Sequence, residues 1–500
     1  MIQSVNPQRA SVLFLEVNEA ERHFLEKLVG EGKLPAFARV LSEGVILNTR
    51  IPDWDAKKDK SWRDISPWII WPSVYTGLAP EEHGIVGFGQ DTSRLRERCV
   101  WDVLDRAGIP IGIFGCLMSY PPRSTGSASF YVPEALADEA ECFPRSARPV
   151  QEFNVYAARN YSEGFGLKGA KALGLLLKAT GAGVSLGTVA RTVAQIPAEK
   201  LLGAHREPER AMLHSYLCFE VFEKLYRKYR PAYTAVHLNH TAYMQHRYWR
   251  AAEPQRFRDA LSETDQRFFK SVDERKRYEQ KFAHWIETSF AFSDRALARM
   301  IDAVPDGGWI LFGTGLGVRP FDPCDEIHNP VVRLVREREL FDAIGLTDYA
   351  VLHQMNPDVT VNLADEAAAA AALEKVRALE VLSGEPLFTA QQRGRQLFLE
   401  LNMPRRSRAH GAPLEIRSPL VPGFRADFAR HISEHWNNDQ STAHHKDAGL
   451  LIAWRKGHRV TSRHTSVPVT DIAPAILSLF GIAPQPWHRP EKLPVFESQG

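Results

Sequence analysis

The stretch that decides the fold runs Ser66-Pro67-Trp68-Ile69-Ile70-Trp71-Pro72-Ser73-Val74-Tyr75-Thr76-Gly77. It predicts one short helix, because Ser66 suits the N-cap, Pro67 suits the first helical position and Gly77 is a natural left-handed terminator. The N-terminus of a helix presents free N–H groups and the positive end of the dipole, so it can bind an anion. The Ser66 hydroxyl is therefore a candidate nucleophile towards phosphorus. Taken alone, the local sequence favours the simpler interpretation that Ser66 only caps a buried helix.

Apolar runs of strand length lie on both sides of this helix in the sequence. They cover residues 11–17, 109–115, 231–238 and 308–312, with helical patterns between them. Nearly continuous apolar runs are typical of strands buried on both faces of a parallel sheet. The alternation predicts an α/β fold with a doubly wound, mostly parallel central sheet flanked by helices.

Changes of composition along the chain predict three parts. We expect the α/β core at 8–149, 230–345 and 430–490, a mostly helical cap insertion at 150–229, and a small α+β subdomain at 346–429. The cap contains a Gly/Ala/Leu-rich segment that is too short to cross a membrane.

The composition excludes several classes of function. The net charge is +2, from 62 basic and 60 acidic residues, which gives no electrostatic case for binding nucleic acid or a membrane surface. The basic cluster at 404–408 is short and is interpreted as a solvated loop. Five scattered cysteines without a C-x-x-C pair argue against a disulfide framework and a cysteine zinc site. With no signal-peptide core and no membrane segment, we expect a cytoplasmic protein; the oligomeric state is left open.

Polar side chains gather where predicted strands or helices end. These are Asn18 with Glu19, Ser66, His240 with His246, and His444-His445-Lys446-Asp447. In a doubly wound sheet these ends can meet at one edge. On a single helix, His240 and His246 would lie about 120° apart, so both can reach the same site only if a turn separates them. Each histidine is either a metal ligand or general acid/base, or a hydrogen-bonded structural residue.

Several motifs resemble the alkaline phosphatase superfamily, on its nucleotide pyrophosphatase/phosphodiesterase and phosphoglycerate-mutase-like side. The most specific is Thr76-Gly77-Leu78-Ala79-Pro80-Glu81-Glu82-His83-Gly84-Ile85, and residues 32–37, 445–451 and 471–483 are similar to further family segments. The resemblance implies two metal ions, usually zinc, and a Thr or Ser at a helix N-terminus that forms a covalent phospho-enzyme.

The sequence departs from that family at its metal ligands. Asn18 replaces the first metal Asp, Ala242 replaces the Asp of an Asp-x-x-x-His motif, and residues 313–316 replace Ser-Asp-His-Gly. A full two-zinc centre is therefore not expected. With these departures we expect at most one divalent metal, zinc or manganese, at Asn18, His246, His445 and Asp447, with Glu19 and His240 as further replacement ligands. The resemblance implies catalytic roles for Ser66 (one residue out of register), Glu19 and His240.

Three functions remain open at this point. The first is a variant phosphoester hydrolase or phosphotransferase that acts on a small phosphorylated molecule, with Arg123, Arg247 and Arg319 as candidate clamps for its phosphate. The alternative is a catalytically inactive superfamily member that binds a ligand or a partner. The third is different chemistry on the same scaffold, using the histidines alone.

Overall fold

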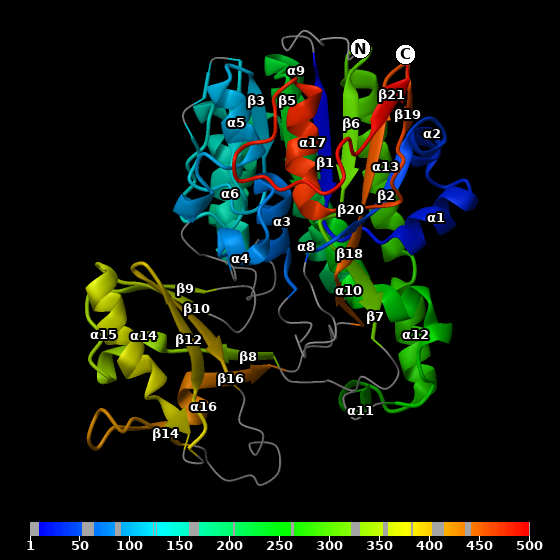
Figure 1. The fold of residues 1–500 in the computed structure, drawn as a ribbon. Coiled ribbons are helices and arrows are strands. Elements are labelled where there is room, and N and C mark those ends of the chain that lie inside the picture. The colour runs from blue at the N-terminus through cyan, green and yellow to red at the C-terminus, as the bar shows by residue number, and fades with distance from the viewer. Residues whose placement is uncertain are drawn as a thin grey trace. The chain divides into compact units, whose positions relative to one another are not determined.

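The computed structural model describes most of the chain (Figure 1). The described residues are 10–52, 65–85, 92–123, 125–126, 128–159, 170–203, 206–261, 265–321, 331–353, 359–381, 384–402, 415–435 and 442–499. They form two compact units, one from the described parts of 1–86, 92–326 and 441–500, the other from those of 327–440. The basic cluster at 404–408 and Cys324 lie outside the described residues. Among those residues, no helix is both long and apolar enough to span a membrane.

The larger unit is built on an eight-stranded sheet of order β20-β2-β18-β6-β1-β5-β3-β4. Its strands are β1 (Val12–Val17), β2 (Val45–Arg50), β3 (Ile111–Phe114), β4 (Phe130–Val132), β5 (Tyr233–Leu238), β6 (Trp309–Gly313), β18 (Ala448–Arg455) and β20 (Ser466–Pro468). All neighbours pair in parallel except β18, which is antiparallel to β2 and β6. The predicted α/β class with a mostly parallel sheet is therefore confirmed.

Strand β1 lies at the centre of this sheet, and its side chains alternate between two cores. Leu13, Leu15 and Val17 pack into one hydrophobic core, whereas Val12 and Phe14 pack into the other. This period of two follows from strand geometry and explains why five of the six residues of β1 are apolar. The exception, Glu16, is buried and accepts a hydrogen bond from the Tyr75 hydroxyl. The first core includes residues of α1 (Arg22–Gly30), α2 (Pro35–Glu43), α9 (Pro208–Tyr229), α10 (His240–Ala252) and α13 (Trp285–Ala303). The second includes residues of α3 (Pro67–Thr76), α5 (Val100–Arg106) and α17 (Ile472–Leu479).

The segment 150–229, expected as a helical insertion, belongs to the larger unit and ends with α9. Its other helices are α6 (Arg148–Arg159), α7 (Ala170–Ala182) and α8 (Leu186–Leu202). The unit also contains α4 (Pro80–His83), α11 (Asp265–Phe268), α12 (Val272–Phe282), β7 (Gly317–Pro320), β17 (Ala443–Lys446), β19 (Arg459–Thr461) and β21 (Glu497–Gln499). Strands β7 and β17 pair antiparallel, with Val318 opposite His445.

The smaller unit has its own core and three small antiparallel sheets. Its four-stranded sheet has the order β12-β13-β10-β9 and its three-stranded sheet the order β11-β14-β15, while β8 pairs with β16. The strands are β8 (Val331–Leu334), β9 (Ala350–His353), β10 (Val359–Asn362), β11 (Glu380–Val381), β12 (Phe388–Arg393), β13 (Gln396–Leu401), β14 (Glu415–Arg417), β15 (Arg425–Asp427) and β16 (Ile432–His435). The helices are α14 (Glu337–Ala343), α15 (Glu366–Arg377) and α16 (Phe428–His431). Pairing of β8 with β16 brings residues on both sides of the expected segment 346–429 into this unit.

Candidate metal centre

Helix α3 begins and ends at the residues that the sequence indicates. Ser66 is the N-cap, and its Oγ accepts a hydrogen bond of 3.3 Å from the backbone N–H of Trp68. Gly77 adopts a left-handed conformation with φ +67° and closes the helix. The residue just before the cap, Ile65, offers its carbonyl oxygen to His445 Nδ1 at 2.6 Å. The N-terminus of α3 is therefore attached to the segment that carries His445.

Glu19, His246 and His445 form a cluster that joins three distant parts of the chain. Glu19 follows β1, His246 lies on α10, and His445 lies on β17. Glu19 Oε2 is 2.6 Å from His246 Nε2, and Glu19 Oε1 is 3.3 Å from His445 Nε2. The two imidazole rings meet edge to face, with their centroids 5.0 Å apart. One ligand atom from each residue lies within 4.8 Å of the other two, so the three could hold a metal ion.

The Nδ1 atoms of His246 and His445 make the hydrogen bonds that are common for metal-ligating histidines. His246 Nδ1 lies 2.9 Å from the carbonyl oxygen of Ala443, as His445 Nδ1 lies beside that of Ile65. Because a carbonyl only accepts, each Nδ1 carries a proton, and the neutral ring presents its Nε2 lone pair to Glu19. A lone pair facing a carboxylate needs a cation between them, either a proton or a metal ion. Two imidazoles and one carboxylate are a known ligand set for catalytic zinc, and hydrogen bonds to backbone carbonyls orient such ligands.

Opposite charges within the cluster shift the pKa values of Glu19 and His445. Burial alone would favour neutral Glu19, but the imidazoles of His445 and His246 outweigh it and hold the pKa of this carboxyl well below its usual range. Burial opposes the charged form of His445, yet the Glu19 carboxylate and the Ile65 carbonyl raise its pKa above the ordinary value. The cluster is therefore an anionic carboxylate that attracts positive charge.

The backbone at Glu19 is held in an unusual conformation. Its φ is +58°, in the left-handed region that non-glycine residues seldom adopt. The Gln245 side chain donates to Glu19 O at 2.6 Å and accepts from Glu21 N at 2.9 Å, and Glu19 N donates to Thr314 O at 3.0 Å. Such a conformation persists where surrounding bonds over-determine it. Gln245 was not among the predicted site residues, and its place directly before His246 is the only signal that the sequence offers.

Asn18 supports the cluster through its amide. Its Nδ2 donates to Glu19 Oε1 at 3.1 Å and to Asn239 Oδ1 at 2.8 Å. Its Oδ1 accepts from Trp71 Nε1 at 2.9 Å. The oxygen that would serve as a metal ligand thus already faces a donor, and the amide acts as a bridge between Glu19 and α3.

The structure does not bring His240 to the cluster. Both histidines lie on the one helix α10, so no turn separates them and their 120° offset sends them to different neighbours. His240 Nε2 lies 2.9 Å from Ser293 Oγ and 3.2 Å from Ser289 O of α13, and burial lowers its pKa to about 3. The expectation that His240 joins the site is corrected to a buried, neutral position against α13.

The remaining residues expected near the metal add no ligand to Glu19, His246 and His445 among the described residues. Asp447 lies between β17 and β18, and the group of ligand atoms within 4.8 Å does not include it. Ala242 is buried within α10. At Gly315, φ is +69°, and a Cβ placed there would lie only 2.8 Å from the Trp71 ring. The indole therefore fills the space beside the position where the resembling family has its Ser-Asp-His-Gly histidine.

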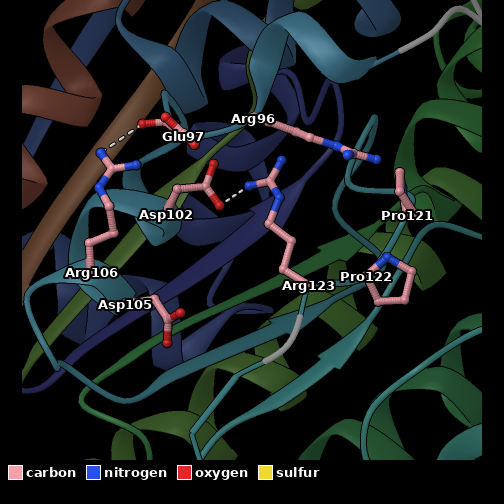
Figure 2. A pocket seen from close by; sticks show the side chains of 8 residues that line it. All are labelled: Arg96, Glu97, Asp102, Asp105, Arg106, Pro121, Pro122 and Arg123. Carbon is pink, nitrogen blue, oxygen red and sulfur yellow. Dashed lines mark hydrogen bonds and ion pairs between the residues drawn. The ribbon is translucent and has the colours of Figure 1, made fainter.

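A separate pocket of about 430 Å³ surrounds Arg123 (Figure 2). It is lined by Arg96, Glu97, Asp102, Asp105, Arg106, Pro121, Pro122 and Arg123. Arg123 pairs with Asp102, and Arg106 donates to the carbonyl oxygen of Glu97. Three basic and three acidic side chains line this pocket, so it offers no net positive charge to a phosphate. Of the other expected clamps, Arg247 stacks on Tyr243 with 4.3 Å to the ring centroid, and Arg319 is exposed on β7.

Comparison with known proteins supports the family named by the motifs. Residues 67–308 match the model of the type I phosphodiesterase/nucleotide pyrophosphatase family, which confirms the resemblance. No curated protein matches the chain.

Three solved structures are similar to this chain at low identity. Human ectonucleotide pyrophosphatase/phosphodiesterase 5 is 12% identical, with 96% of this chain and 97% of that chain covered and a TM-score of 0.38. Phosphonoacetate hydrolase from Sinorhizobium meliloti 1021 is 14% identical over 89% and 90% of the two chains, with a TM-score of 0.34. The alkaline phosphatase PafA is 13% identical over 97% and 98%, with a TM-score of 0.39.

Proposed function

We propose that this protein is a phosphoester hydrolase with one divalent metal ion at Glu19, His246 and His445 and a nucleophile at Ser66. The observation that carries the proposal is the 2.6 Å contact between His445 Nδ1 and the Ile65 carbonyl. It joins the residue directly before Ser66 to a ligand of the cluster. The family match over residues 67–308 includes α3 and His246 and supports the same class of reaction.

The groups around this site have different roles in the proposed reaction. When bound, a zinc or manganese ion supplies Lewis-acid polarisation of a phosphoryl oxygen. The N-terminus of α3 contributes the positive end of its helix dipole towards the other phosphoryl oxygens, because the N–H groups of Trp68, Ile69 and Ile70 already donate to Ser66. The Ser66 hydroxyl attacks phosphorus and displaces the leaving alcohol, and water then resolves the phospho-enzyme. Asn18 and Gln245 keep Glu19 in position through the bonds described above.

Metal analysis tests this proposal most directly. We expect about one equivalent of zinc or manganese in the purified protein, and its loss in the double variant His246→Ala/His445→Ala. His458→Ala is the matched control, because this histidine lies in the turn between β18 and β19 and should leave the metal content unchanged. Hydrolysis of bis-p-nitrophenyl phosphate and p-nitrophenyl phosphate should follow the metal content. A folded protein without stoichiometric metal and without turnover would overturn the proposal.

Two observations favour a second candidate, a non-catalytic binding protein. The Trp71 ring fills the space beside Gly315, and Asn18 Oδ1 already accepts a hydrogen bond. Both features remove room for a second metal ion. The binding-protein alternative predicts no bound metal and no turnover, with retained affinity for a phosphorylated ligand in calorimetry. The same metal analysis separates the two functions.

A further inference from the structure

Helix α8 exposes an apolar stripe to solvent. Leu186, Ala190, Val193, Pro197 and Leu201 are all exposed, and their spacing of four, three, four and four residues puts them on one face. Leu186 is 75% exposed and Leu201 is 83% exposed. Such side chains at the surface of a helix need an explanation when they form a row, whereas scattered ones do not.

The neighbouring helix α7 has the same property. Leu173 and Leu177, four residues apart, are 44% and 51% exposed. On its other side, Leu176 and Ala179 are buried in the core of the larger unit. A helix that is apolar on both sides is ordinarily covered on both sides. We call the exposed side chains Leu173, Leu177, Leu186, Val193 and Leu201 the α7–α8 apolar surface.

The exposed charges on these two helices are all positive. Among their described residues, Lys171, Lys178 and Lys200 are exposed, and no acidic residue is exposed. The single acidic residue of α7 and α8, Glu199, accepts from Arg210 Nε at 2.6 Å. Although the net charge of the whole chain is only +2, cationic side chains are therefore in excess beside the apolar surface.

We propose that the α7–α8 apolar surface binds anionic lipid bilayers in the plane of the interface. Exposed leucines with flanking lysines are the pattern of interfacial helices, which bury their apolar side in the acyl boundary and attract anionic headgroups. A second copy of this chain fits the surface poorly. A two-fold interface would set the same face against itself and would bring the three lysines of each copy together.

Vesicle co-sedimentation tests this binding. The protein should sediment with vesicles of phosphatidylcholine containing about a third phosphatidylserine, and much less with phosphatidylcholine alone, because each lysine near an anionic surface contributes roughly fivefold in affinity. Raising the salt concentration to about 0.5 M should weaken binding, since it screens the charges.

Two variants locate the surface, and one serves as a control. Leu186→Ser/Val193→Ser/Leu201→Ser and, separately, Lys171→Glu/Lys178→Glu/Lys200→Glu should each reduce binding by about tenfold or more. Leu420→Ser is the matched control, because Leu420 is 58% exposed in the other unit and should not change binding.

Circular dichroism shows whether each variant is folded, and the charge variant keeps the test decisive if the serine variant is not. Equal binding to both vesicle types, or unchanged binding in a folded charge variant, would overturn the proposal. So would a stable dimer in light scattering that the serine variant converts to a monomer.

Discussion

The indole N–H of Trp71 donates a hydrogen bond of 2.9 Å to Asn18 Oδ1, which couples α3 to the end of β1. Both residues are buried. Asn18 in turn donates to Glu19 Oε1 at 3.1 Å. A side chain of the helix therefore reaches the candidate metal ligand through a single amide, and this relation makes Trp71 testable as a positioning residue.

We expect Trp71→Phe to lower the free energy of unfolding by about 2–3 kcal/mol, since it removes ring volume and leaves Asn18 Oδ1 unsatisfied. Asn18, which bonds to Glu19, would lose its hydrogen bond from Trp71, and this loss should weaken metal binding by about tenfold. Urea unfolding and metal titration measure the two effects.

Trp101→Phe is the matched control for that experiment. Trp101 is fully buried, but its Nε1 has no hydrogen-bond partner among the described residues. The control should therefore lose stability through packing alone and keep the metal affinity of the unaltered protein. Equal metal affinity in both variants would show that Trp71 only packs.

Glu134 makes the stability of the protein depend on pH. Burial raises the pKa of this carboxyl to about 7, against hydrogen bonds from the Ser119 N–H, the Ser119 hydroxyl and the Tyr120 N–H that favour the charged form. Its ordinary value is 4.5, so between pH 4.5 and 7 the folded state binds more protons than the unfolded state. The contribution of Glu134 is thus fully present below pH 4.5 and falls by about 3 kcal/mol as the pH rises to 7.

Glu134→Gln should remove this pH dependence, because the amide does not titrate. Buried His214 and His240 have the opposite effect on stability below pH 6.5, where the unfolded state binds more protons at these positions than the folded state. Burial lowers the pKa of these two imidazoles to about 4 and about 3. The measurement is therefore the difference in unfolding free energy between variant and unaltered protein at each pH from 4.5 to 7.5. A difference that stays constant over that range contradicts the assignment.

The sequence predicted the sheet better than it predicted the site. Continuous apolar runs identified the buried parallel strands, because most positions of a strand covered on both faces are apolar. The antiparallel pairing of β18 with β2 was not predicted, since the direction of a strand leaves no mark in its composition. The boundary of the smaller unit depends on the pairing of β8 with β16, which lie about 100 residues apart and carry no local signal.

Residue type and strand ends were sufficient to bring Glu19, His246 and His445 together as candidates. They were not sufficient for His240, whose position depends on α10 staying helical from His240 to His246, before its kink at Tyr248. Gln245 was not predicted, because its role follows from the left-handed turn at Glu19, and its position next to His246 is a weak signal by itself.

Gln245→Leu should destabilise the turn that presents Glu19. The change keeps similar volume but leaves the buried carbonyl of Glu19 and the N–H of Glu21 without their partner, at a cost of about 2–4 kcal/mol. Metal affinity should fall with it, because the carboxylate is no longer held in place. Gln151→Leu is the control: Gln151 is equally buried and donates to Glu134 O, so this variant should lose stability and keep its metal. Equal metal content in the two variants would show that the Gln245 clamp is structural only.

Ser66→Ala separates the two interpretations of the α3 N-cap. Loss of a capping hydroxyl costs about 1 kcal/mol of stability, whichever interpretation holds. If Ser66 is the nucleophile, the variant should also lose about a thousandfold or more in phosphodiester hydrolysis, as expected when a covalent step is removed. Ser271→Ala is the matched cap variant, since the Ser271 side chain accepts from Glu274 N at the start of α12. It should lose similar stability without losing activity, and a Ser66→Ala protein that behaves like it would leave Ser66 as a cap alone.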